Sequence, residues 1–290
     1  MPSFSLLSTG KGDPKAGKAP AVRCLEGIFR ILPATTWGRI MKMPGAQKEI
    51  RRMCAEYGIS LEDLRKADRF NACANAGACA LSCLHFCGRN DSAHAHEHLG
   101  EPFRSSITLG RWRRTFRLLH AQEGLYQDLK RECLLLAKHA REAGLVPVVR
   151  INGLSDLPNL ASRLAQDVQE SDPGIRFLDY TKIQLYAGTG SMEPRLEWYA
   201  GTVFRSYSVS EHAGSVAFAE KLLAMGHSVS VVGDRPWEPG MTWEGHPTID
   251  GDTHDIRFAD PVGSVAWLTA KGPAKSLPAG REGSWVQLPD

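Results

Sequence analysis

The chain has 290 residues, of which 42% are hydrophobic and 23% are charged, and its formal net charge is +3. This length supports a large buried core, and so small a net charge gives no general argument for nucleic-acid binding. No run of about 18 apolar residues could span a membrane, and residues 1–10 lack the features of a signal peptide. We therefore expect a cytoplasmic protein with no membrane partner.

The first 27 residues are rich in glycine, proline and lysine, which predicts a flexible basic arm. Residues 28–290 contain no further linker and are expected to form a single α/β domain. A short strand is predicted at 28–32, where Pro33 ends it. An inserted helical segment is predicted around 38–70, with its clearest apolar spacing between residues 45 and 66.

Four of the seven cysteines lie within one short segment, in the order Cys73-x5-Cys79-x3-Cys83-x3-Cys87. In a reducing cytosol such a group indicates metal binding rather than disulfides. Four thiolates can close a zinc site, and three can hold a [4Fe-4S] cluster with one open iron. The simpler alternative is a helix with buried free cysteines, and Cys133 is expected to be a buried structural thiol.

Histidines and acidic residues outside this segment are weaker candidates. Residues 88–102 are predicted to form a polar loop with His94, His96 and His98, which are either zinc ligands or solvated side chains. His254 follows Asp250-Gly251-Asp252, where it can join a hard-metal site or act as a general acid or base. The Asp-Gly-Asp sequence is equally typical of a turn.

From residue 104 onward, helical and strand patterns alternate regularly. One long helix is predicted at 107–143, and the apolar runs predicted as strands are 146–151, 175–178, 202–206, 228–232 and 264–269. Together with 28–32 these make six strands separated by helices, the pattern of a mostly parallel sheet. An open doubly wound sheet satisfies this pattern, but we favour a partial (β/α)6 TIM-like barrel with an N-terminal helical insertion.

Polar residues follow each of the predicted central strands. Because parallel strands end on one side of the sheet, these residues are expected to converge around a ligand. The predicted catalytic residues are Asp156, Asp179, Lys182, Glu211 and His254. The predicted cofactor-binding residues are Asn152, Gly153, Ser155, Ser208, Ser210, Gly233 and Asp234. The alternative role for such acids and serines is helix capping.

The order of these motifs resembles a family of phage- and plasmid-encoded proteins of uncharacterised function, typified by mycobacteriophage gene product 88. The resemblance covers residues 28–272. It is carried by the spacing of Cys73, Cys79 and Cys83, by Arg150-x-Asn152-Gly153-x-Ser155-Asp156, by Asp179-Tyr180-Thr181-Lys182, by Ser208-x-Ser210-Glu211 and by Asp250-Gly251-Asp252 through Lys271-Gly272. The chain differs from the family pattern in the extra thiol of Cys87.

The layout also resembles that of radical S-adenosylmethionine enzymes, in which a first strand, a three-cysteine loop and repeated helix–strand units follow one another. The resemblance implies that S-adenosylmethionine lies near Asn152 to Asp156, Ser208 to Glu211 and Gly233-Asp234. The spacing of the cysteines departs from that superfamily, and no Gly-Gly-Glu follows the second strand.

These observations leave three functional hypotheses. The first is a cluster-dependent enzyme with a small-molecule substrate at the strand ends. The second is a zinc-containing protein that binds or modifies nucleic acid through a basic helix bearing Trp112 and the arginines Arg104, Arg111, Arg113, Arg114 and Arg117. The third is a hydrolase with a hard metal held by Asp156, Asp179, Asp252 and His254.

Overall fold

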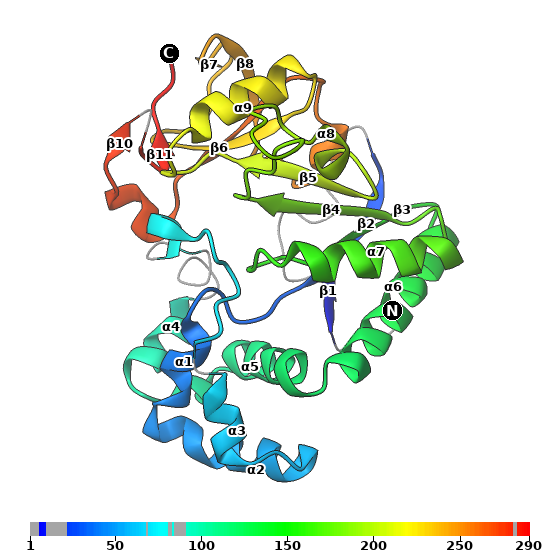
Figure 1. Ribbon diagram of the computed structural model, residues 1–290, viewed down its shortest axis with the longest axis vertical. Helices are drawn as coiled ribbons and strands as arrows, with labels where there is room; N and C mark the ends of the chain where they lie inside the picture. Colours follow the sequence, from blue (N-terminus) through cyan, green and yellow to red (C-terminus); the bar gives the residue numbers. More distant parts are fainter. Residues whose placement is uncertain (1–5, 10–21, 68, 81–82, 84–90, 281–282) are drawn as a thin grey trace.

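The computed structural model describes residues 6–9, 22–67, 69–80, 83, 91–280 and 283–290, and residues 91–94 by their backbone only. One large sheet occupies the upper part of the molecule in Figure 1, and a group of helices lies below it. Within the described residues the sheet has eleven strands, in the path β1-β2-β3-β4-β5-β6-β9-β8-β7, with β11 paired to β6 and β10 paired to β11.

Six neighbouring strands of this sheet are parallel and keep their order along the chain. They are β2 (Cys24–Phe29), β3 (Val146–Arg150), β4 (Arg176–Thr181), β5 (Val203–Ser208), β6 (Val229–Gly233) and β9 (Val265–Thr269). The other strands lie beside them: β1 (Leu7–Thr9), β7 (Thr242–Trp243), β8 (His246–Asp250), β10 (Ala279–Gly280) and β11 (Val286–Gln287). Of these, β1 is antiparallel to β2, whereas β8 is parallel to β9.

The six parallel strands correspond to the six predicted from the sequence, but the predicted architecture is only partly right. The sheet has more than six strands and does not close on itself, so a TIM-like barrel is not confirmed. The first strand starts at Cys24, whereas the sequence predicted a start at residue 28. The prediction missed the beginning of the strand because the charged residue Glu26, which is buried, interrupts its apolar pattern. The predicted arm at 1–27 therefore includes β1 and the start of β2, while residues 10–21 lie outside the described chain.

Three long helices cover one face of the sheet. Both α6 (Gln122–Glu142) and α7 (Pro158–Ser171) pack on β2 to β4 through residues such as Leu136, Leu164 and Val149, and α9 (Ser215–Ala224) packs on β5, β6 and β9. Val203 and Tyr207 lie on the same face of β5, and each belongs to one of these two apolar clusters, so all three helices pack on one face of the sheet. This arrangement explains the strand order. When every crossover has the same hand and passes over the same face of the sheet, each new parallel strand is added on the same side of the previous one.

A separate helical unit lies below the sheet and corresponds to the predicted insertion. It contains α1 (Thr36–Met41), α2 (Gln47–Tyr57), α3 (Leu61–Lys66) and α5 (Ser106–His120), with a short 3₁₀ helix at Pro44–Ala46. Its core is aromatic: Trp37 and Trp112 are fully buried and stack with ring centroids 5.4 Å apart.

Two predicted elements differ from the structure in this part of the chain. The helix predicted at 107–143 is two helices, because the backbone leaves the helical region at Ala121, between α5 and α6. The polar loop predicted at 88–102 contains a helix, α4 (Asp91–His98), so His96 and His98 are helical residues, followed by a short 3₁₀ helix at Pro102–Arg104. The side chain of His94 lies outside the description. Among the described helices, none is long and apolar enough to cross a membrane.

Candidate functional site at the strand ends

Residues 72–80, which carry Cys73 and Cys79, are hydrogen-bonded to loops at the carboxyl ends of the parallel strands. The backbone N–H of Asp156, after β3, donates to the carbonyl of Ala72 over 2.8 Å. The thiol of Cys73 donates to the carbonyl of Leu154 at 3.4 Å, and the carbonyl of Asn75 accepts from the ring of His212 at 3.0 Å. These contacts join residues 72–80 to the loops that follow β3 and β5.

Glu211 makes the closest contact with this segment. Its Oε1 accepts a hydrogen bond from the backbone N–H of Ala78, at the start of the 3₁₀ helix Gly77–Ala80. Gly77 has a positive φ of 39°, and a Cβ at this position would overlap the carboxylate of Glu211. A glycine is therefore required at residue 77 both for the backbone conformation and for the approach of Glu211.

The thiol of Cys73 lies in a buried environment close to other acidic groups. Burial first, and then the nearby charges of Cys83, Asp156 and Cys79, raise the pKa of Cys73 to about 12. Cys79 and Cys83 are thus close enough to act on Cys73, and none of the three forms a disulfide with a described cysteine. Cys87 lies outside the described residues.

Asp156 organises the loop after β4. Its carboxylate accepts hydrogen bonds from the Thr181 hydroxyl at 3.0 and 3.1 Å and from the backbone N–H of Lys182 at 3.1 Å. Burial raises the pKa of Asp156, while the hydrogen bonds from Lys182 and Thr181 oppose this change. Asp156 thus fixes the direction in which Lys182 leaves the sheet.

Lys182 and Glu211 face each other beside the cysteine segment. Lys182 Nζ lies 3.9 Å from Glu211 Oε2, and the two side chains are only 12% and 19% exposed. Within the described part of the chain, neither Nζ nor Oε2 has a hydrogen-bond partner. Trp285, just before β11, places its ring centroid 5.0 Å from Nζ. The sequence predicted Lys182 and Glu211 as site residues but gave no indication of Trp285.

Asn152 and Asp179 form a second polar group, which faces the helices. Asp179 accepts hydrogen bonds from the backbone N–H and the side-chain amide of Asn152, both at 2.9 Å. Asn152 in turn accepts from the Ser155 hydroxyl and from the backbone N–H of Leu157, at the start of α7. Asp179 is 2% exposed, and burial raises its pKa to about 6.

Asp179, predicted as a catalytic residue, is therefore buried and bonded to the turn after β3. The neighbouring Gly153 packs so tightly that an added Cβ would meet Ile28, Arg30 and the carbonyl of Phe29. Asn152, Gly153 and Ser155 therefore hold the turn between β3 and α7.

The remaining predicted cofactor-binding residues are spread along the sheet. Ser208 ends β5, and Ser210 is fully buried against Ser215, whose hydroxyl accepts from the backbone N–H of Ser210 at 2.9 Å. Gly233 lies under the indole ring of Trp267, and Asp234 forms hydrogen bonds with Arg235 at 2.9 and 3.0 Å. None of these contacts brings Gly233 or Asp234 to Lys182.

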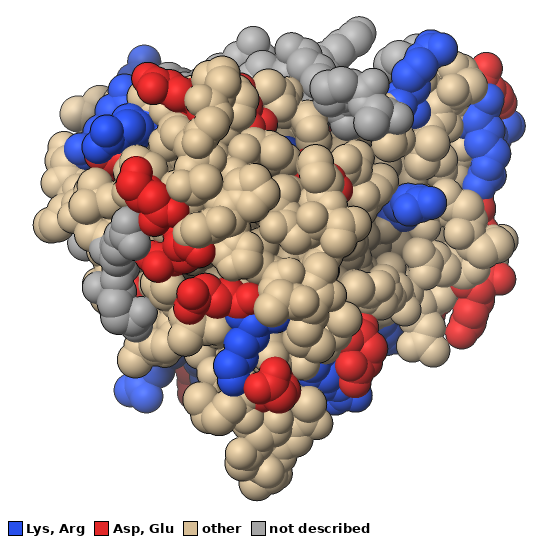
Figure 2. Space-filling model, turned by 90° about the horizontal axis from the view of Figure 1, so that it is seen from above, with Lys and Arg blue, Asp and Glu red and all other residues tan. Residues whose placement is uncertain are grey.

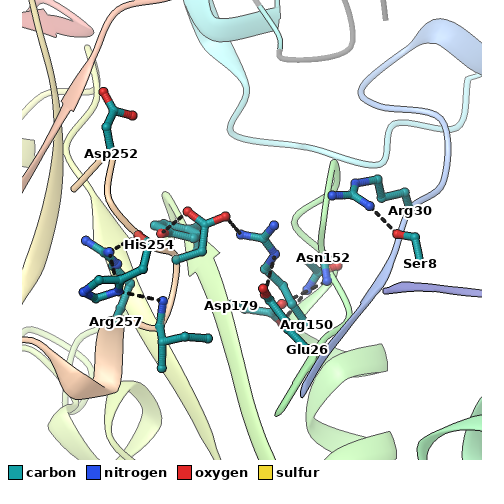
Figure 3. A network of polar contacts seen from close by, with 12 residues as sticks. Ser8, Glu26, Arg30, Arg150, Asn152, Asp179, Asp252, His254 and Arg257 are labelled. Atoms are coloured by element: carbon teal, nitrogen blue, oxygen red, sulfur yellow. Dashed lines mark hydrogen bonds and ion pairs between the residues drawn. The ribbon is translucent and has the colours of Figure 1, made fainter. Parts of the chain in front are cut away.

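His254 belongs to a buried ionic network on the sheet face opposite the helices (Figure 3). Its Nδ1 accepts from the backbone N–H of Ile256 at 3.2 Å and from Arg257 at 3.1 Å, so its proton is carried on Nε2, 3.7 Å from Asp260. Arg257 and Asp260 are fully buried and lie 3.2 Å apart. Burial raises the pKa of Asp260 to about 6.

The same network continues toward β2 and β3. Arg150 contacts Asp255 at 3.2 Å and Glu26 at 3.8 Å, and the hydroxyl of Tyr180 donates to Asp255 at 3.5 Å. Neither Glu26 nor Asp255 is among the site residues predicted from the sequence. The sequence did contain a signal for this network. A charged residue interrupts each of two apolar strands, Glu26 in β2 and Arg150 in β3.

The predicted hard-metal site does not form among the described residues. Asp252 accepts from Lys271 at 2.7 Å and from the backbone N–H of Thr269, whereas His254 faces Arg257 and Asp179 faces Asn152. More generally, no three His, Cys, Asp or Glu side chains in the described chain are arranged as metal ligands.

The tryptophan and the arginines predicted for nucleic-acid binding are buried or paired with other groups. Trp112 is fully buried, Arg111 is 5% exposed, and Arg114 donates to the carbonyl of Arg30 at 2.7 Å. Two further arginines of α5 pair with acids, Arg113 with Glu49 at 2.8 Å and Arg117 with Asp128 at 2.6 Å. Arg104, which lies just before α5, pairs with Glu101 at 3.3 Å. On the face shown in Figure 2, basic and acidic described residues are interspersed without a continuous basic patch.

The fold and the strand-end site define an α/β protein with six parallel strands in chain order, whose cysteine segment is bonded to the loops that follow β3 and β5. A family model described as gene product 88 matches residues 38–283, so the chain belongs to the gene product 88 family of phage-type proteins. No curated protein and no solved structure matches the chain.

Proposed function

We propose that the protein binds a [4Fe-4S] cluster or zinc through Cys73, Cys79 and Cys83, and that it is an enzyme with its active site at the carboxyl ends of the parallel strands. The supporting observation is the attachment of residues 72–80 to these strand ends by Asp156, Glu211 and His212. Ligands of parallel α/β proteins bind at this edge of the sheet.

The thiol groups of the three cysteines are suitable ligands for a soft metal, but their positions in the structure do not form a complete metal site among the described residues. Three thiols share one region, and thiolates are the preferred ligands of zinc and iron–sulfur clusters. No complete ligand group is present among the described residues, so metal binding requires Cys79 and Cys83 to turn toward Cys73. The participation of Cys87 is part of this proposal and determines whether the site has three or four thiolates.

A radical S-adenosylmethionine-like activity is the specific form of this proposal. It is supported by the position of the cysteine segment after the first of six parallel strands that keep chain order. A cluster with an open iron would supply electrons to a bound cofactor. The roles of the chain's own groups are then to bind and orient: Lys182 and Glu211 face the site, and Asp156 holds the backbone of Lys182.

Metal and sulfide analysis of protein purified without oxygen tests the proposal. We expect bound iron with sulfide, or bound zinc, and a loss of most of it in Cys73→Ala, Cys79→Ala and Cys83→Ala. Cys54→Ala is the matched control, because Cys54 is a buried thiol of the separate helical unit. Full metal occupancy in all three variants, or none in the parent protein, would contradict the assignment. Cys87→Ala measures the fourth ligand.

Zinc-dependent nucleic-acid binding is the alternative proposal. The pairing of the α5 arginines and the burial of Trp112 reduce its support. Binding to DNA or RNA that weakens steeply with salt, together with zinc and no sulfide, would favour this alternative.

A further inference from the structure

Two polar atoms at the strand ends are buried side by side without hydrogen-bond partners among the described residues. Lys182 Nζ has three N–H donors, and Glu211 Oε2 is an acceptor. Their separation of 3.9 Å is an ion-pair distance but is too long for a hydrogen bond. Native proteins rarely leave buried polar atoms in this state, so each such atom calls for an explanation.

Both side chains are held in position from behind. Glu211 Oε1 accepts from the backbone of Ala78, which directs Oε2 toward Lys182. The backbone N–H of Lys182 donates to Asp156, which itself accepts from Thr181. Because strand ends and the cysteine segment fix both groups, the pair differs from a mobile surface ion pair and is organised for binding.

We propose that Lys182 and Glu211 form a two-point subsite for a neutral ligand group that carries a hydrogen-bond acceptor beside a donor, the edge presented by carboxamides and nucleobases. The acceptor of the ligand takes a hydrogen bond from Lys182, and its donor gives one to Glu211. This subsite rests on the proposed function, since it specifies the ligand chemistry of the same strand-end site.

Charge selects this chemistry over the alternatives. An anion would satisfy Lys182 but would be repelled by Glu211, and a cation would meet the opposite conflict. A zwitterion would bring two more charges out of water, which is costly in a buried site. A neutral edge completes both hydrogen bonds and leaves the attraction between Lys182 and Glu211 unchanged.

Trp285 distinguishes the two sources of such an edge. Its ring lies 5.0 Å from Lys182 Nζ and is partly buried, so it offers an apolar surface next to the polar pair. A planar heterocycle gains from contact with this ring, whereas a small aliphatic amide gains little. Binding of nucleosides and of propionamide therefore separates the sources.

The experiment measures dissociation constants of the full chain by ligand-observed NMR, with adenosine, cytidine and propionamide as probes. We expect binding of a nucleoside or of propionamide, and at least about tenfold weaker binding to Lys182→Met and Glu211→Met, as for loss of a hydrogen bond to a charged group. Lys271→Met is the matched control, because Lys271 follows β9 and already pairs with Asp252 at 2.7 Å. Its affinity should equal that of the parent.

A second measurement uses only the parent protein and so does not depend on the folding of variants. N6,N6-dimethyladenosine and N4,N4-dimethylcytidine lack the donor and should bind at least about tenfold more weakly than the unmodified nucleosides, provided that a nucleobase is the ligand group. Equal affinity, no binding of any probe, or preferred binding of acetate or glycine would overturn the subsite.

Metal and sulfide contents of the same samples keep the two proposals apart. Metal-replete protein that binds no probe contradicts the subsite alone. Protein that binds the probes but never contains metal contradicts the proposed metal site alone.

Discussion

The sheet carries buried polar groups on two sides of the molecule, and the two regions satisfy them differently. On the face opposite the helices, Arg150, Arg257, Asp255 and Asp260 neutralise one another across 3.2 Å contacts. At the strand ends, Asp156 and Glu211 accept mainly from backbone N–H groups and a hydroxyl, and Lys182 Nζ lies 3.9 Å from Glu211 Oε2. Both regions contain buried atoms without a hydrogen-bond partner among the described residues, on Lys182 and Glu211 in one and on Arg257 and Asp260 in the other. The first region resembles a folding element, and the second resembles a binding element.

Removing a charge from the opposite-face network should cause the largest loss of stability. Arg257→Met leaves the fully buried Asp260 without its partner, and we expect a loss of about 3–5 kcal/mol in the free energy of unfolding. Urea denaturation measures this loss. Arg195→Met, at an exposed ion pair with Glu197, is the control and should change stability by less than about 1 kcal/mol. A loss below about 1 kcal/mol for Arg257→Met would remove the contrast between the regions.

The pH dependence of stability should also identify the network. Burial raises the pKa of Asp260 from 3.8 to about 6, so the folded state binds this proton more tightly than the unfolded state. Its contribution is complete below pH 3.8 and is lost as the pH rises through about 6. We expect Asp260→Asn to remove a gain of up to about 3 kcal/mol between pH 7 and pH 4, relative to the parent protein. Parallel stability curves for the two proteins would refute this.

Substitution of Asp179 tests whether this residue, which accepts from Asn152, is a structural group or part of the binding site. Asp179→Ala leaves the buried N–H groups of Asn152 without acceptors, and we expect a loss of about 2–3 kcal/mol. Asp179→Asn retains one acceptor and should lose less. Thermal and urea unfolding measure both variants. If Asp179→Ala were as stable as the parent protein, Asp179 would not be a structural group, and its predicted catalytic role would stand.

The smallest effect is expected at Asp156. Asp156→Asn keeps an oxygen that can accept from the Lys182 backbone, so stability should stay within about 1 kcal/mol of the parent. Probe binding at Lys182 should weaken, because the amide leaves a single oxygen to accept from both the Thr181 hydroxyl and the Lys182 backbone and so holds Lys182 less firmly. A variant that unfolds readily would show that Asp156 is a structural group like Asp179.

Apolar runs and helix signals were sufficient to predict the six parallel strands and the cysteine-bearing segment between the first and second of them. They failed where a buried charge interrupted the pattern, as at Glu26, and where a single residue, Ala121, divided one amphipathic stretch into two helices. Short edge strands such as β1 and β7 depend on distant pairing, which no local pattern contains.

The candidate site was predictable to a similar extent. Because parallel strands end together, Asp156, Lys182 and Glu211 could be grouped from the sequence alone. Side-chain direction could not: Asp179 points toward the helices and His254 lies on the opposite face, although both follow predicted turns or strands. Trp285 was missed because β11 reaches the site only through its pairing with β6.

The fork at β6 has a consequence for how the site comes into being. β5 pairs with β6 only as far as Ser230, and β11 takes over at Val232 and Gly233, so the chain near Trp285 fills the opening between two diverging strands. Trp285 and the cysteine segment are separated by about two hundred residues along the chain. Contacts between such distant residues form late in folding. A nascent or proteolysed chain that ends before Trp285 would therefore hold its thiols beside an open gap, exposed to metal ions and oxidants before the site can discriminate between them.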